Sequence, residues 1–285
     1  MPKVLIAGCG FVGLATARLF AQRDWEVIGL THSEESAAKL AGEAFKVMAC
    51  DIGERASVEA HAHLGPFDVV VHCASSGRGG AEQYRRVYLE GARHLNAVFT
   101  PAQLLFTSST SVYAQTDGGW VTEDSLVEPD RETGRLLRET EDLVITQKGI
   151  VARLAGIYGP GRSVLLRKFF DGTAIIEGEG AKWINQVHRD DIAGALARLA
   201  HFRVSGVFNV TDNQPLTQHE IYTWLAQRFN RPLPSSGPID VNRKRGWTNK
   251  RVSNARLRAL GWTPRYPSFF EAVASDPELV QNAGA

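Results

Sequence analysis

Short apolar runs alternate with amphipathic segments along most of the chain. Each run has about the length of a buried strand and lacks a clean alternation of apolar and polar residues, which is typical of parallel strands covered on both faces. The runs occupy residues 3–8, 25–30, 45–50, 67–74, 103–109, 150–156 and 206–211.

The segments between these runs repeat their hydrophobic residues at helical spacing, as in 12–24, 33–44 and 81–99. Ser33 is expected to cap the second of these helices, because Glu34 and Glu35 follow it in the first turn. Strand followed by helix, several times over, predicts an α/β fold with a doubly wound parallel sheet of the Rossmann type.

The regular alternation of strands and helices ends at about residue 156. Beyond it, loops rich in glycine and proline separate two further predicted helices, 190–202 and 217–230. A chain of 285 residues fits one large domain with a smaller lobe. The sequence predicts a dinucleotide-binding domain over 1–160, with 189–212 returning to it. A smaller C-terminal substrate lobe is expected from 161–188 and 213–285.

Three glycines in GxGxxG spacing, Gly8, Gly10 and Gly13, follow the first strand and open the first helix. In that context Gly8 allows a tight turn, Gly10 lets the backbone approach a pyrophosphate, and Gly13 allows close packing of the helix. The spacing therefore predicts a dinucleotide site, and a glycine turn without a ligand is the alternative.

The end of the second strand carries Thr31, His32 and Ser33, where an acidic residue would normally bind the adenosine ribose hydroxyls. Hydroxyls and an imidazole can donate to a 2′-phosphate, which favours NADP, with NAD as the alternative. Ser33 as a plain helix cap and His32 as an exposed loop residue are the competing interpretations. Asp51 and Ile52 end the third strand, where they are expected to contact the adenine, and an ordinary turn aspartate is the alternative for Asp51.

Charge and cysteine content argue against nucleic acid, membranes and metal ions as partners of the chain. Lysine and arginine total 32 against 31 acidic residues, so no global field attracts the chain to nucleic acid or to a membrane surface. Three cysteines without CxxC spacing indicate reduced thiols and no metal site. Because the first apolar run is too short for a membrane span, we expect a cytoplasmic protein.

One local exception to the balanced charge is the basic segment 242–262, in which tryptophans are interleaved. Two interpretations stay open for it: a solvated helix face, or a site for an anionic substrate. Its basic residues are Arg243, Lys244, Arg245, Lys250, Arg251, Arg256 and Arg258.

The order of motifs resembles the extended short-chain dehydrogenase/reductase superfamily, whose members include nucleotide-sugar epimerases and dehydratases. The motifs are the glycine loop, "VVVHCAS" at 69–75, "FTSSTSVYA" at 106–114 and "ARLAGIYGPGR" at 152–162. The resemblance implies that Ser109 takes the place of the catalytic serine or threonine and that Tyr113 is the structural tyrosine of its motif.

The same resemblance places the catalytic YxxxK pair at Thr133 and Leu137, so this chain is an atypical member of the superfamily. No tyrosine of the chain is followed four residues later by lysine. A threonine hydroxyl is too weak an acid to be the base near neutral pH, and a leucine cannot lower a neighbour's pKa. This departure puts hydride chemistry by the usual pair in doubt.

Three residues are candidates for the missing acid or base. Tyr88 aligns with a family asparagine on a helix behind the active site, Tyr158 lies in the loop at the cleft, and His188 is a potential general acid. A tyrosine packed against its helix neighbour and a buried hydrogen-bonded histidine are the competing interpretations for Tyr88 and His188.

These observations leave two functions open. The first is an NADP-dependent epimerase, dehydratase or reductase acting on an anionic or sugar-like carbonyl compound, phosphorylated or nucleotide-linked, with a non-standard acid/base. The second is a catalytically inactive NADP(H)-binding regulatory or sensor protein. A homodimer through two helices, 81–99 and 133–147, is expected from the resemblance. The residues expected to contact the cofactor are Gly8, Gly10, Phe11, Val12, Gly13, Thr31, His32, Ser33, Asp51, Ile52, Ala74 and Thr133.

Overall fold

The structure, a computed structural model, describes residues 1–77, 79–240 and 247–281. The chain forms two compact units, each assembled from three segments. Unit 1 comprises Met1–Val112, Glu128–Arg153 and Ile192–Phe208, and unit 2 comprises Tyr113–Val127, Leu154–Asp191 and Asn209–Ala285. The domain boundaries expected at residues 160, 188 and 212 stay predictions. Arg243, Lys244 and Arg245 of the basic segment lie outside the described residues.

A seven-stranded sheet forms the centre of unit 1, in the order β12-β7-β5-β4-β1-β2-β3. Strand β1 pairs in parallel with both β2 and β4, β2 with β3, and β4 with β5. Residues Val4, Leu5, Ile6 and Ala7 of β1 are fully buried, as expected for the middle of a sheet covered on both faces. The strands are β1 (Lys3–Ala7), β2 (Glu26–Thr31), β3 (Lys46–Ala49), β4 (Val69–His72), β5 (Gln103–Ser109), β7 (Ile150–Leu154) and β12 (Gly206–Val210).

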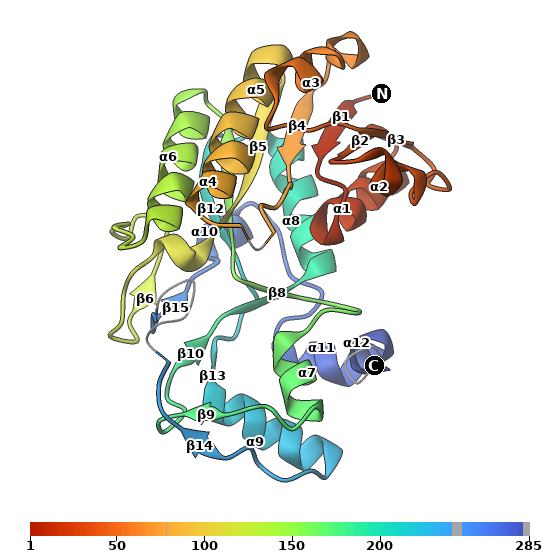
Figure 1. Cartoon of the computed structure of the whole chain (residues 1–285). Coiled ribbons are helices and arrows are strands. Elements are labelled where there is room, and N and C mark those ends of the chain that lie inside the picture. Colours follow the sequence, from red (N-terminus) through yellow and green to blue (C-terminus); the bar gives the residue numbers. More distant parts are fainter. Residues whose placement is uncertain (78, 241–246, 282–285) are drawn as a thin grey trace. The chain divides into compact units, whose positions relative to one another are not determined.

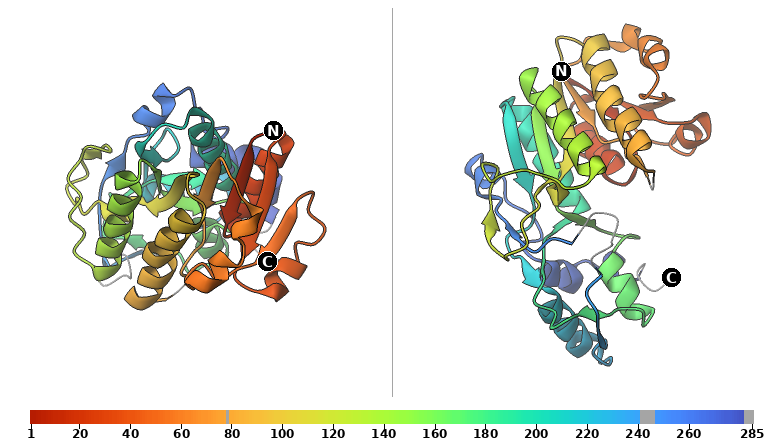
Figure 2. Two further views of the ribbon diagram at one scale, coloured as in Figure 1. Left: turned by 90° about the horizontal axis from the view of Figure 1, so that it is seen from above. Right: turned by 60° about the vertical axis from the view of Figure 1, so that its left-hand side comes forward.

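Helices cover both faces of this sheet (Figure 2). Helix α1 packs against β1 and β2, whereas α5 and α6 pack against β5 (Figure 1). The order of strands runs outward from β1 in both directions, and right-handed crossovers then place the two groups of helices on opposite faces. The helices are α1 (Phe11–Gln22), α2 (Glu34–Ala38), α3 (Arg55–Glu59), α4 (Ala81–Tyr84), α5 (Gly91–Val98), α6 (Glu132–Thr146) and α8 (Arg189–Phe202). The doubly wound α/β fold expected from the sequence is confirmed.

The predicted helix 81–99 contains a π-helical turn, η2 (Arg85–Glu90), between α4 and α5. Such turns widen a helix locally and occur frequently at functional sites. The second predicted helix, 33–44, is shorter than expected, because α2 ends at Ala38. Ser33 caps it as predicted, since its hydroxyl accepts a hydrogen bond from the backbone N–H of Ser36.

Unit 2 consists of two-stranded sheets and helices around a core of aromatic and aliphatic side chains that includes Tyr158, Phe169, Tyr222 and Phe269. Its longest helix, α9, begins with a reciprocal capping box between Thr217 and Glu220. The strands are β6 (Trp120–Val121), β8 (Gly156–Tyr158), β9 (Ile176–Glu177), β10 (Trp183–Ile184), β11 (Gln186–His188), β13 (Leu216–Thr217), β14 (Ser236–Gly237) and β15 (Arg251–Val252). The helices are α7 (Val164–Phe170), α9 (Gln218–Phe229), α10 (Ala255–Ala259), α11 (Phe269–Ser275) and α12 (Pro277–Gln281).

In the part of the chain that the structure describes, no helix combines the length and the apolar character needed to cross a bilayer.

Candidate functional site

The glycine loop joins β1 to α1, and its three glycines meet different surroundings. Gly8 has a φ of +102°, and a Cβ there would lie 2.4 Å from the Cα of Ala74. A Cβ on Gly13 would lie 2.0 Å from the carbonyl oxygen of Gly8. A Cβ on Gly10 would meet nothing within 4 Å. Gly8 and Gly13 are therefore required by the fold itself, whereas the space at Gly10 is open to a ligand.

Helix α1 begins beside this open space, and none of its own side chains caps or neutralises its N-terminus. Its N-cap residue is Gly10, which provides no side-chain hydrogen bond, and no acidic residue lies in the first turn. The partial positive charge of a helix N-terminus attracts anions, and the diphosphate of a dinucleotide is the group this arrangement suits. Phe11 is partly exposed and Val12 is buried in this first turn.

A cavity of about 280 Å³ lies at the carboxyl ends of β1, β2, β3 and β4. The chain leaves β1 toward β2 and β3 and then crosses to β4 on the other side of β1, so the cavity lies where the strand order reverses. Ligands of open α/β sheets bind at this position. The cavity is lined by Gly8, Leu30, Thr31, His32, Cys50, Asp51, Ile52, Ala74, Ser75, Ser76, Gly77, Gln83, Arg86 and Val87.

Half of the predicted cofactor residues line this cavity, namely Gly8, Thr31, His32, Asp51, Ile52 and Ala74. The other predicted residues do not line it, namely Gly10, Phe11, Val12, Gly13, Ser33 and Thr133. In the loop after β4, sequence reasoning predicted Ala74 but missed Ser75, Ser76 and Gly77, and it also missed the side chains that α4 and η2 contribute. The serines and glycine directly after the fourth strand were a usable signal for the loop, because the ends of neighbouring parallel strands meet at one edge.

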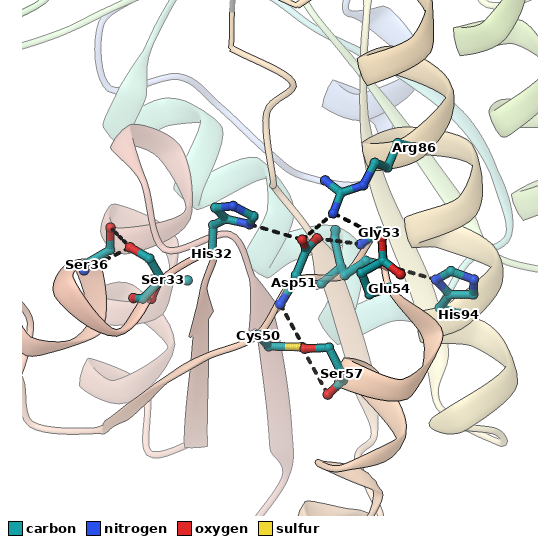
Figure 3. Close-up of polar contacts among 12 residues, drawn as sticks. His32, Ser33, Ser36, Cys50, Asp51, Gly53, Glu54, Ser57, Arg86 and His94 are labelled. Atoms are coloured by element: carbon teal, nitrogen blue, oxygen red, sulfur yellow. Dashed lines mark hydrogen bonds and ion pairs between the residues drawn. The ribbon is translucent and has the colours of Figure 1, made fainter.

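Arg86 is the main charged residue that the sequence did not reveal (Figure 3). Its guanidinium pairs with Asp51 Oδ2 and lies 3.3 Å from Glu54 Oε1. The hydrogen bond from Arg86 to Asp51 raises the pKa of the guanidinium. On the other side of Asp51, the Nδ1 atom of His32 lies 3.7 Å from Oδ2. The cavity wall therefore carries Asp51 in contact with both Arg86 and His32, and Glu54, outside the wall, contacts Arg86.

The hydroxyls expected to contact the cofactor are partly used within the fold. Ser33 caps α2 and also donates to the hydroxyl of Ser36. The hydroxyl of Thr31, a buried residue, donates to the carbonyl oxygen of Ser33 at 3.3 Å. The His32 side chain is 74% exposed. Among the three residues at the end of β2, His32 is thus the one whose side chain is open to a ligand.

Tyr88 lies on the π-helical turn, next to the wall of the cavity. Its hydroxyl accepts a hydrogen bond from the backbone N–H of Ser76 at 3.3 Å, and its ring packs edge-on against Tyr84. His72 of β4, which is fully buried, lies with Nε2 3.0 Å from the carbonyl oxygen of Val87. The buried imidazole thus supports the turn that positions Tyr88.

Ser109 ends β5, and its hydroxyl oxygen accepts a hydrogen bond from the backbone N–H of Ser111 at 3.2 Å. Tyr113 is fully buried and donates to Asn209 Oδ1 at 2.9 Å, which is a structural role. Thr133 is partly exposed in the first turn of α6, whereas Leu137 is buried in the core. Leu137, the residue predicted to stand at the position of the superfamily's lysine, is therefore a core residue.

Tyr158 and His188 belong to unit 2, where their rings pack edge-on at 5.3 Å. Both side chains are buried, and burial raises the pKa of Tyr158 and lowers that of His188. His188 Nδ1 accepts from the backbone N–H of Asp190, and Nε2 lies 3.3 Å from Asp276 Oδ2. The candidates Tyr158 and His188 are therefore in contact with each other within unit 2.

Within the described residues, no group of three or more histidine, cysteine, aspartate or glutamate side chains is arranged to hold a metal ion. Cys9, Cys50 and Cys73 are all free thiols. Burial raises the pKa of Cys9 to about 12, so that this thiol is inert near neutral pH.

Comparison with known proteins agrees with this architecture. Protein YeeZ of Escherichia coli is 26% identical over 283 residues, covering 94% of this chain and 97% of that protein. A structure from Methylobacillus flagellatus, assigned to the NAD-dependent epimerases/dehydratases, is 31% identical with a TM-score of 0.80 and covers 98% of each chain. MoeE5 in complex with UDP-glucose and NAD shares the fold at 20% identity, with a TM-score of 0.81 over 99% of this chain and 100% of that chain. The model of the NAD dependent epimerase/dehydratase family matches residues 4–211, and the chain belongs to that family.

Proposed function

We infer that this protein binds NADP(H) in the cavity of unit 1 and acts, in the cytoplasm, on an anionic or sugar-like carbonyl compound. The observation that carries the proposal is the open space at Gly10 beside the uncapped N-terminus of α1, next to a cavity of about 280 Å³. The family binds nicotinamide dinucleotides, and this combination suits a diphosphate and an adenosine.

The preference for NADP rests on the end of β2. No carboxylate occupies that strand end, and the exposed imidazole of His32 is available to donate to a 2′-phosphate. Asp51 is close by, but its negative charge is offset by Arg86. NAD is normally bound by a carboxylate that accepts from the ribose hydroxyls at this strand end, and residues 31–33 include no carboxylate.

The proposed substrate class follows from the relatives. MoeE5 was solved with UDP-glucose and NAD, which makes a nucleotide-linked sugar a reasonable model for the substrate. In the proposed reaction Ser109 polarises the carbonyl through its hydroxyl, and Tyr88, beside the cavity, is the candidate acid or base. Tyr158 and His188 stay candidates from unit 2.

A second function is favoured by one observation, the buried Leu137 in the position of the superfamily's lysine. A protein that keeps the dinucleotide cavity and lacks the usual acid/base pair suits a regulatory or sensor role. Such a protein would bind NADP and NADPH and change its affinity for a partner without turning over a substrate.

Calorimetric titration with NADPH and NADH tests cofactor binding. We expect NADPH to bind more tightly than NADH, and Gly10→Ala to weaken both, because the new methyl group occupies the space proposed for the diphosphate. The matched control is Gly42→Ala, since a Cβ there also meets nothing within 4 Å. Equal binding by the wild type and Gly10→Ala would show that the cofactor does not bind at the glycine loop. Equal affinity for NADPH and NADH would refute the NADP preference.

Turnover separates the two functions. A reductase should oxidise NADPH in the presence of a carbonyl substrate, whereas an epimerase or dehydratase should convert a nucleotide-linked sugar without net oxidation of the cofactor. Ser109→Ala should lose either activity. If Ser109→Ala leaves turnover unchanged while Tyr88→Phe abolishes it, the assigned role of Ser109 is wrong. No turnover with any nucleotide-linked sugar, together with a partner affinity that differs between NADP and NADPH, would establish the sensor.

A further inference from the structure

Arg86 lies in a part of unit 1 that is shaped to receive its side chain (Figure 3). A Cβ on Gly53 would lie 2.7 Å from Arg86 Cγ and 3.1 Å from both Cζ and Nε. The φ of Gly53 lies outside the left-handed region, so the backbone conformation does not demand a glycine there. The glycine is therefore explained by the arginine that lies across it.

The same distances show which side of the guanidinium contacts Gly53. Cζ and Nε are bonded neighbours in the guanidinium plane, both lie equally far from the Cβ position, and neither terminal nitrogen lies nearer. Gly53 is therefore packed against one flat face of the group. Because Arg86 lines the cavity of about 280 Å³ and Gly53 does not, the arginine forms the cavity surface at this point. The opposite flat face is left for the cavity.

Two carboxylates hold the guanidinium at one end. Nη2 of Arg86 pairs with Asp51 Oδ2 and lies 3.3 Å from Glu54 Oε1. Asp51 is itself fixed, because its Oδ1 accepts from the backbone N–H of Gly53 at 3.0 Å and its own N–H donates to Ser57 Oγ at 3.0 Å. The loop 51–57 thus provides both the surface beneath the arginine and the acceptors at its end. A long, flexible side chain is thereby held in one orientation.

The surroundings of Arg86 suit a flat, uncharged ring better than an anion. Asp51 and Glu54 already offset the charge of the guanidinium, which leaves it little attraction for a phosphate. A guanidinium plane stacks on aromatic faces, and nucleic-acid bases are bound in this way. The cavity also has apolar walls, as is usual for the binding site of a small molecule. The apolar residues that line it are Leu30, Ile52, Ala74 and Val87.

We propose that the guanidinium of Arg86 stacks on the adenine ring of the dinucleotide, and that Asp51 positions it there. The inference rests on the proposed function, because it takes the cavity of unit 1 to be the cofactor site. Asp51 then acts through Arg86, in place of the direct contact with adenine expected from the sequence. Arg86 recognises the base of the cofactor, whereas His32 is the residue proposed to bind the 2′-phosphate.

Calorimetric titration of the full chain with AMP, NADH and NADPH tests the stacking. Arg86→Ala should weaken binding of all three ligands by the same factor, about tenfold, because each carries an adenine. Arg86→Lys should weaken it nearly as much, since a lysine keeps the charge and lacks the plane. Arg55→Ala is the matched control, because Arg55 is an exposed arginine of α3 that pairs with Glu59, and this variant should bind as the wild type does.

Gly53→Ala tests the position of the arginine without removing it. The new methyl group would lie 2.7 Å from Arg86 Cγ, so the side chain must shift to accommodate it. We expect binding of all three ligands to weaken by a smaller, equal factor. Gly42→Ala should leave binding unchanged, because a Cβ there meets nothing within 4 Å. The melting temperatures of the ligand-free variants check that each is folded.

A double-mutant cycle tests the role of Asp51. Asp51→Asn keeps an oxygen for the N–H of Gly53 and loses the charge that pairs with Arg86. If Asp51 acts through the arginine, this change weakens AMP binding in the wild type and adds nothing in Arg86→Ala. An equal loss in both backgrounds would show that Asp51 contacts the adenine directly, and would overturn its positioning role.

Two further results would overturn the stacking. Loss of NADPH affinity alone in Arg86→Ala, with AMP and NADH unchanged, would assign the arginine to the 2′-phosphate. Unchanged binding of all three ligands by Arg86→Ala would show that Arg86 does not contact the base, and would leave the proposed cofactor site intact. Failure of the wild type to bind any of the three would instead refute the proposed cofactor site, and the stacking with it.

Discussion

At the scale of single residues, two glycines of the glycine loop are required by packing, and the third is not. Gly8 and Gly13 lack room for a Cβ, because backbone atoms lie 2.4 and 2.0 Å from where it would be. Gly10 has that room, so packing does not require a glycine there, and the proposed diphosphate would account for it. The spacing alone could not make this distinction, since all three glycines look equivalent in the sequence.

His72 is a residue whose titration should be visible in the stability of the protein. Burial lowers the pKa of its imidazole to about 4, from an ordinary value of 6.5. The folded state therefore keeps His72 neutral at a pH where the unfolded chain is already protonated. Its contribution is fully present above about pH 6.5 and is lost as the pH falls toward about 4.

From these values, lowering the pH from about 7 to about 5 should cost the wild type about 2 kcal/mol of unfolding free energy through His72. His72→Gln, which keeps a donor for Val87 and does not titrate, should lose less stability over this range. Urea unfolding at both pH values measures the difference, and His201→Gln, an exposed histidine, is the control. An identical pH dependence in wild type and His72→Gln would contradict the assignment.

At the scale of secondary structure elements, α6 carries the two residues predicted to stand in place of the YxxxK pair. Thr133 is partly exposed near the start of the helix, and Leu137, one turn later, is buried in the core of unit 1. Helix periodicity puts both positions on related faces. The depth of Leu137 depends on the sheet beneath the helix, which the local sequence does not describe.

Restoring the residues of the superfamily pattern should therefore destabilise the protein at Leu137 and leave its stability almost unchanged at Thr133. Leu137→Lys should cost about 3 kcal/mol or more, because it buries an unpaired charge. Thr133→Tyr should change stability by less than about 1 kcal/mol, since the position is partly exposed. Chemical denaturation measures both variants, with Leu137→Met as the volume-conserving control. A Leu137→Lys protein as stable as the wild type would show that the helix has room for the lysine's charge.

At the scale of the whole molecule, the expected homodimer stays a prediction. Ion pairs join the two helical segments across their surface: Arg85 and Arg93 lie 3.9 and 3.5 Å from Glu139. The large hydrophobic residues exposed in the described chain lie elsewhere, among them Trp120 and Leu126. A dimer through these helices would therefore have a charged interface, and salt screens such contacts.

Sedimentation velocity at low and high salt tests this interface. We expect the dimer to dissociate as sodium chloride rises from about 0.05 M to about 0.5 M, because the Debye length shortens below the spacing of the charges. Glu139→Lys should dissociate it at low salt, with Lys39→Glu, an exposed charge on unit 1, as the control. A dimer that persists at high salt would place the interface on other helices or strands.

The fold class was determined by the sequence, because strand and helix periodicities are local properties of the chain. The GxGxxG spacing is equally local, and it predicted where a dinucleotide would bind. Ser33 as a helix cap and Tyr113 as a structural tyrosine were also predictable, since each depends on a short motif. Tertiary structure alone decided the rest of the site. Arg86 pairs with Asp51 across 35 residues of sequence. Charge pairing and burial arise only when distant segments pack together, and no local pattern encodes them.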